Sequence, residues 1–173
     1  MKTRRYGSRG AAALQFAFLG SVLVLAAGVT VPVVTSRVEA NERARALGDL
    51  RRVAADILNY QRDTGVWPGH RRFAYTDGAP AHGEERACGS VRGGAHVSRF
   101  LTDNEPRTAG WKGPYMSVSR PDPWGHRYIV LLAGLQSPGP PYGWLLSAGP
   151  DGFFQTGVDD AKLKGDDLGL LVR

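Results

Sequence analysis

The feature that most constrains this chain is a long uncharged stretch near its N-terminus. Residues 11–34 read AAALQFAFLGSVLVLAAGVTVPVV and contain no Asp, Glu, Lys or Arg. As a helix they would extend about 36 Å, which is enough to cross a hydrocarbon core of roughly 30 Å. We therefore expect a transmembrane helix over residues 11–36. The alternative is a secretory signal peptide, although the apolar run is unusually long and lacks a clear A-x-A cleavage site.

The charges around this segment predict its orientation. The chain carries 22 Lys+Arg against 16 Asp+Glu, a formal net charge of +6. The basic residues that precede the apolar segment, with no acidic residue among them, are Lys2, Arg4, Arg5 and Arg9. Positive charge beside a membrane helix stays in the cytoplasm, so the remainder of the chain is expected across the membrane. Because the excess of basic over acidic residues lies mainly at the N-terminus, it does not indicate a nucleic-acid-binding surface.

Beyond Pro32 the sequence changes from uniformly apolar to amphipathic. Apolar residues recur largely at three- and four-residue steps between charged ones: Val38, Leu47, Leu50, Val53, Ile57 and Leu58. The pattern predicts one long helix over residues 11–63, which Pro32 bends and which Gly65 and Pro68 end.

The rest of the chain is expected to be mainly β-structure and loops. Residues 64–110 show little periodicity and predict an irregular region with a short helix near 98–101. Strand candidates follow at residues 114–118, 126–133 and 142–147, separated by Pro/Gly turns. Together these elements predict an α+β fold, in which the helix packs on a small antiparallel β-sheet.

Four short segments resemble, in order, those of the type IV pilin-like family and of the major (G-type) pseudopilins of type II secretion systems. They are ILNYQRDTGVWPG, GWKGPYM, DPWGHRY, and SAGPDG followed by DDLG. The resemblance implies a type IV pilin-like fold and a non-enzymatic structural subunit of a pseudopilus. Such a subunit polymerises with itself and other pseudopilins and helps to drive protein export across the outer membrane. It is first a single-pass inner-membrane protein with a periplasmic domain, and its other partners are an inner-membrane assembly platform and a prepilin peptidase.

The resemblance also implies how the N-terminus is processed. It divides the chain into a basic leader (residues 1–10), a transmembrane and assembly helix (11–36) and a periplasmic domain (37–173). Cleavage would follow Gly10, and the new amino group of Ala11 would be methylated. Gln15 stands where the family usually has Glu, and it offers a hydrogen bond but no charge. This departure leaves open whether the subunit is major or minor. Pro32 falls where many pilins have a helix proline.

The resemblance further implies a calcium site in the acidic C-terminal region. Calcium takes roughly six to eight oxygen ligands, which carboxylates and backbone carbonyls supply. The implied ligands are the carboxylates of Asp151, Asp166 and Asp167 and the backbone carbonyls of Ser147 and Ala148. Additional candidate ligands are Asp159 and Asp160. The alternative is a solvated acidic loop whose charge is neutralised by Lys162 and Lys164.

Other possible functions have weaker support in the sequence. No zinc-ligand spacing is matched by His82, Cys88 and His96. In addition, no motif indicates a nucleophile or an acid–base pair, so we expect no enzyme activity. Tryptophan beside Pro and Gly favours packing over a carbohydrate-binding surface, and this applies to Trp67, Trp111, Trp124 and Trp144. The second hypothesis is a membrane-tethered periplasmic module that binds calcium or carbohydrate and does not polymerise.

Overall fold

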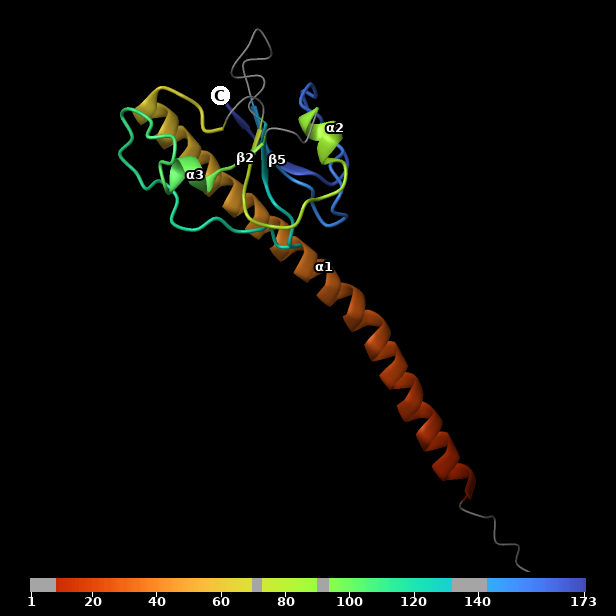
Figure 1. Ribbon diagram of the computed structural model, residues 1–173. Coiled ribbons are helices and arrows are strands. Elements are labelled where there is room, and N and C mark those ends of the chain that lie inside the picture. The colour runs from red at the N-terminus through yellow and green to blue at the C-terminus, as the bar shows by residue number, and fades with distance from the viewer. Residues whose placement is uncertain (1–8, 70–72, 90–93, 132–142) are drawn as a thin grey trace, which may run out of the picture. The chain divides into compact units, whose positions relative to one another are not determined.

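The computed structural model describes residues 9–69, 73–89, 94–131 and 143–173, with side chains from residue 37 onward. It has an α+β fold in which a helix packs against a five-stranded mixed sheet of order β2-β1-β3-β4-β5 (Figure 1). The helices are α1 (Arg9–Thr64), α2 (Glu84–Cys88) and α3 (Ser98–Leu101). The strands are β1 (Phe73–Tyr75), β2 (Ala95–His96), β3 (Ile129–Leu131), β4 (Gly143–Ser147) and β5 (Leu168–Val172).

The chain divides into two compact units, Met1–Ala40 and Asn41–Arg173. The second unit holds the sheet and the half of α1 that packs on it. In the part of the chain whose side chains the structure describes, no helix is sufficiently long and apolar to cross a membrane. The predicted leader and membrane segment, with Gly10, Ala11, Gln15 and Pro32, lie outside that part.

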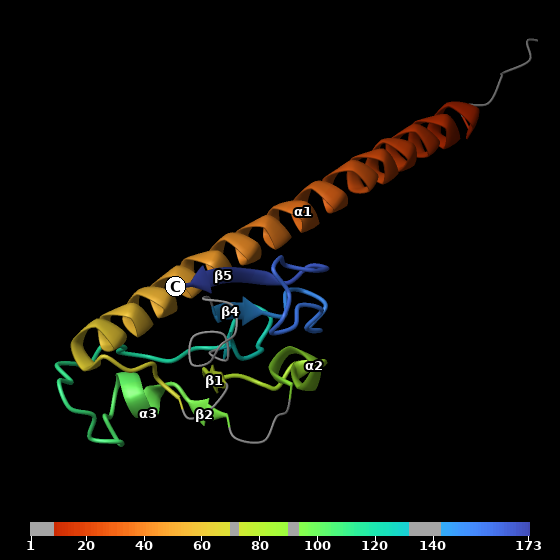
Figure 2. The same ribbon diagram turned by 90° about the horizontal axis from the view of Figure 1, so that it is seen from above.

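The sheet is mixed because one of its four strand pairs is parallel. β1 pairs with β3, β3 with β4, and β4 with β5, all antiparallel, whereas β1 and β2 run parallel. The prediction of a purely antiparallel sheet is wrong at this pair. A parallel neighbour requires a crossover of about a dozen residues or more. The chain between β1 and β2 is long enough for one and contains α2 (Figure 2).

Each face of the sheet supports its own core. Tyr128 and Val130 point toward α1, and Ile129 and Leu131 toward the opposite face, as the two-residue period of a strand requires. The buried α1 side chains of the first core are Leu50, Val53, Ile57 and Tyr60. In Figure 1, α1 and α3 lie on one side of the strands and α2 on the other.

The structure confirms some predicted boundaries and corrects others. The long helix ends at Thr64, and Gly65 follows with φ 74°, its N–H donating to the Gln61 carbonyl at 2.7 Å. The short helix at residues 98–101 is confirmed. Residues 114–118 form no strand, because the N–H groups of Tyr115 and Met116 donate to the Leu101 carbonyl instead. The region at 64–110 is more regular than predicted, since it contains β1, α2 and β2.

Candidate metal centre

The loop between β4 and β5 folds back so that its two ends meet. Gly149 has φ 69°, a left-handed conformation that glycine adopts without strain. A Cβ atom at this position would lie 2.5 Å from the backbone oxygen of Asp166. Gly149 therefore permits a close approach that brings the start of the loop against the two aspartates before β5.

A ring of hydrogen bonds then links three carboxylates of the loop through Gln155. The Asp151 N–H donates to Asp166 Oδ2 at 3.2 Å. The Gln155 amide group donates from Nε2 to Asp151 Oδ2 at 2.6 Å, and its backbone N–H donates to Asp167 Oδ2 at 3.0 Å. The Thr156 N–H donates to the same Asp167 oxygen at 2.6 Å. Asp151 and the adjacent pair Gln155–Thr156 are thereby held against the adjacent pair Asp166–Asp167.

Three oxygen atoms of this ring are buried without a hydrogen-bond partner. They are Gln155 Oε1, Asp166 Oδ1 and Asp167 Oδ1. Asp167 is only 5% exposed, and burial raises the pKa of its carboxyl even though the Thr156 and Gln155 groups that donate to it lower that pKa. A buried polar atom that lacks a partner costs roughly 1–3 kcal/mol. These oxygens are hard donors of the chemical type that calcium prefers.

Some of the predicted calcium ligands lie together in this loop, and others are bonded elsewhere. Asp151, Asp166 and Asp167 meet in the ring, and Ser147 and Ala148 lie buried at its edge. Asp160 is engaged elsewhere, since it pairs with Lys164 at 2.7 Å and accepts the Gly157 N–H at 2.8 Å. Within the described ranges, no group of three His, Cys, Asp or Glu side chains is arranged to hold a metal.

Two residues important for this region were not predicted from the sequence. Gln155 is not singled out by its sequence, because its side chain is a neutral amide and the candidate ligands are clustered carboxylates. Asp122 is buried, and its Oδ1 accepts the N–H groups of Trp124 at 3.0 Å and His126 at 2.8 Å. Its Oδ2 accepts the Ser147 hydroxyl at 2.7 Å, which connects the DPWGH turn to the end of β4. The Asp-Pro dipeptide does indicate this turn, but not its partner on β4.

His82, Cys88 and His96 do not form a common site. His96 hydrogen-bonds Asp77 at 2.9 Å and Ser98 at 2.7 Å, whereas the His82 ring stacks on Phe153. Cys88 is buried on α2, and burial raises the pKa of its thiol to about 12. The thiol therefore stays protonated at neutral pH and is a poor nucleophile.

Three of the tryptophans have packing roles. The Trp111 indole N–H donates to the Phe100 carbonyl at 2.9 Å, and that of Trp144 donates to the Asp160 carbonyl at 2.8 Å. Trp144 is buried, and Trp67 and Trp111 pack against the core beneath α1.

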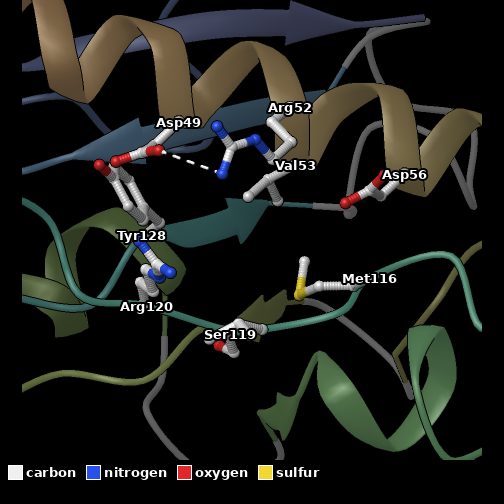
Figure 3. A pocket seen from close by; sticks show the side chains of 9 residues that line it. Asp49, Arg52, Val53, Asp56, Met116, Ser119, Arg120 and Tyr128 are labelled. Carbon is white, nitrogen blue, oxygen red and sulfur yellow. Dashed lines mark ion pairs between the residues drawn. The ribbon is translucent and has the colours of Figure 1, made fainter.

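A separate groove lies between α1 and residues 116–120 (Figure 3). Asp49 and Asp56 line it from α1, and burial raises the pKa of the Asp56 carboxyl to about 6 although Arg52 lowers it. Arg52 lies 3.9 Å from Asp49, and Arg120 faces them from the opposite wall. The groove is therefore lined by two acidic and two basic side chains.

Comparison of the chain with protein-family models, curated proteins and solved structures returned no match.

Proposed function

We propose that this chain is a pilin-like assembly subunit, most similar in its plan to the pseudopilins of type II secretion. The observation that carries the proposal is that the four family-like segments contact one another in pairs. Short motifs that matched by chance would have no reason to meet in the fold. The pairing occurs at two places, the end of α1 and the end of β4.

The first pair joins the DTG segment at the end of α1 to the GWKGPYM segment. The Tyr115 hydroxyl donates to Asp63 Oδ2 at 2.9 Å, and Lys112 Nζ lies 3.3 Å from Asp63 Oδ1. These groups hold the pKa of Asp63 below its usual range, the Tyr115 hydrogen bond having the largest effect. Gly110 allows the contact, because a Cβ there would lie 2.4 Å from the Asp63 carbonyl oxygen.

The second pair joins the DPWGHRY segment to the SAGPDG segment. The Ser147 hydroxyl in the SAGPDG segment donates a hydrogen bond to the Asp122 carboxylate in the DPWGHRY segment, and both residues are buried. Ser147 Oγ also accepts the Gly149 N–H at 3.2 Å, at the glycine where the acidic loop begins. This pair therefore connects the turn before β3 to the candidate metal centre.

The proposed mechanism assigns separate tasks to the two halves of the long helix. The uncharged residues 11–34 would keep the subunit in the inner membrane and later pack against the same segment of neighbouring subunits. The amphipathic half of α1 is fastened to the sheet by Leu50, Val53, Ile57 and Tyr60. Head-to-tail contacts that do not close on themselves generate a helical filament, with the sheet domain as its outer layer.

Calcium would stabilise the domain at the loop between β4 and β5. Asp166 and Asp167 would hold it through the oxygens that lack a hydrogen-bond partner. The ion would supply positive charge to adjacent carboxylates, which otherwise repel each other. The role proposed for the ion is structural.

The experiment that tests the proposed function is the mass of the mature protein. Expressed in membranes together with a prepilin peptidase, the full chain should lose residues 1–10 and begin at an N-methylated Ala11. A Gly10→Val variant, which blocks the cleavage that the family requires, is the control and should keep the leader. A wild-type chain that retains Met1, or that begins near Gly28 as a signal peptide would predict, would contradict the proposal.

A further inference from the structure

We infer that a second copy of this chain docks on α1 and places its Arg51 in the groove beside Asp56. The contact lies in the half of α1 that packs on the sheet, so it is separate from the uncharged residues 11–34. The inference rests on the proposed function, and it adds a second contact between neighbouring subunits, one that charged side chains make.

The outer face of α1, opposite its buried face, carries arginine and no acidic residue between residues 41 and 64. At about 100° per residue, its exposed members span about one third of the helix circumference. They are Asn41, Ala44, Arg45, Gly48, Arg51, Arg52, Ala55 and Arg62. A Cβ at Gly48 would meet nothing within 4 Å, so the face is open to a partner. Arg51 lies near its centre, and among the described residues the Arg51 side chain forms no hydrogen bond or ion pair.

Acidic residues of the same helix lie together on one flank. They recur at every seventh position, a spacing that keeps side chains on one side of a helix, and they are Glu42, Asp49, Asp56 and Asp63. Asp63 pairs with Lys112 at 3.3 Å. Asp49 lies 3.9 Å from Arg52. The Asp56 carboxylate has no hydrogen bond or ion pair within the described ranges, so it can accept a cation from another chain.

The groove between α1 and residues 116–120 suits an arginine side chain at its Asp56 end. In Figure 3, Arg52 and Arg120 lie toward the end of the groove that Asp49 lines, away from Asp56. Burial raises the pKa of the Asp56 carboxyl, and a guanidinium beside it would offset that cost. Val118, which lines the groove and is 58% exposed, offers apolar surface to the aliphatic part of an arginine.

Arg51 and Asp56 of one chain cannot form this pair with each other. They are five positions apart and about 140° apart around the helix axis, whereas side chains that meet on a helix are three or four positions apart. Each copy therefore offers Arg51 to one neighbour and Asp56 to another. Such a heterologous contact continues from copy to copy, which fits a helical filament better than a closed dimer.

Charge reversal in the full chain, expressed with its secretion machinery, tests the contact through the yield of sheared filaments. Arg51→Asp and Asp56→Lys are each expected to lower the yield about tenfold or more, because each places like charges opposite one another. The double variant should recover the wild-type yield, because the two charges again attract with their signs exchanged. Asp56→Asn should give a smaller loss, and it keeps the test valid if lysine disturbs the groove.

Co-expression of the two single variants separates a contact between copies from a defect in folding. The Arg51→Asp chain retains Asp56, and the Asp56→Lys chain retains Arg51, so alternating copies satisfy every contact. Filaments that contain both chains are expected at close to the wild-type yield. Each chain keeps its own substitution, so this recovery cannot come from repair of its fold.

Matched controls are available on α2, which lies on the opposite face of the sheet from α1. Glu85 and Arg86 are exposed there. Glu85→Lys and Arg86→Asp change the net charge by the same amounts as the test variants, and they should leave the filament yield unchanged.

Four results would overturn the inference, and they differ in what they leave standing. A processed wild-type chain that forms no filaments removes the proposed assembly together with this contact. A wild-type yield from both single variants removes the contact alone. Losses that neither the double variant nor co-expression restores show that Arg51 and Asp56 do not pair. Equal losses in the α2 controls show that net charge, and not this contact, determines the yield.

Discussion

Tyr60→Ala is expected to destabilise the folded domain by about 3–5 kcal/mol, the usual cost of removing a buried aromatic side chain. Tyr60 is 1% exposed, and its ring meets those of Phe100 and Tyr115 edge to face at centroid distances of 6.5 and 5.8 Å. It thus joins α1 to α3 and to the GWKGPYM segment. The cavity left by alanine would separate these elements. The measurement is urea unfolding of the full chain in detergent, followed by tryptophan fluorescence.

Tyr60→Phe is the matched control for this variant. It keeps the ring and removes only the hydroxyl, which hydrogen-bonds the Thr108 hydroxyl at 2.9 Å. The expected loss is about 1 kcal/mol, the net contribution of one hydrogen bond. Equal losses for the two variants would mean that this ring does not hold α1 against α3 and the GWKGPYM segment.

Asp122→Ala is expected to cost about 3 kcal/mol or more in the same assay. Asp122 is 3% exposed, and alanine would leave three donors without an acceptor: the N–H groups of Trp124 and His126 and the hydroxyl of Ser147. Each hydrogen bond to a charged group contributes roughly 1.5–3 kcal/mol, and the losses are not fully additive.

Two controls isolate the role of Asp122. Ser147→Ala removes one of the three donors together with its need for an acceptor, so it should cost only about 1 kcal/mol. Asp103→Ala removes an exposed carboxylate and should change the stability by less than about 0.5 kcal/mol. If Asp122→Ala behaves like Asp103→Ala, the turn before β3 does not depend on this carboxylate.

The sequence predicts best the elements that have a long, regular pattern. The amphipathic spacing of Leu50, Val53 and Ile57 locates the helix face that packs on the sheet, and Gly65 locates its end to within one residue. β1 and β2 are missed because strands of three and two residues are too short to show alternation. β5 contains an apolar run, but the DDLG segment, which overlaps the start of this strand, suggests a charged loop instead of a strand.

The candidate site is predicted in part, for a related reason. Carboxylates clustered late in the sequence indicate a cation site, and the fold does bring Asp151, Asp166 and Asp167 together. Composition cannot show which oxygens remain free after the loop has satisfied its own N–H groups. That depends on contacts such as the one between Gln155 and Asp151, which local spacing does not specify.

We propose that this chain assembles into a filament through its uncharged helix. The most direct measurement is to overproduce the full chain with its secretion machinery, shear the cells, and examine the sedimented material by electron microscopy and immunoblotting. We expect thin filaments that contain the processed chain, and we expect these filaments to be lost when Gly10→Val blocks processing. A processed chain that remains entirely in the membrane fraction, with no filaments, would contradict assembly and favour a tethered module that does not polymerise.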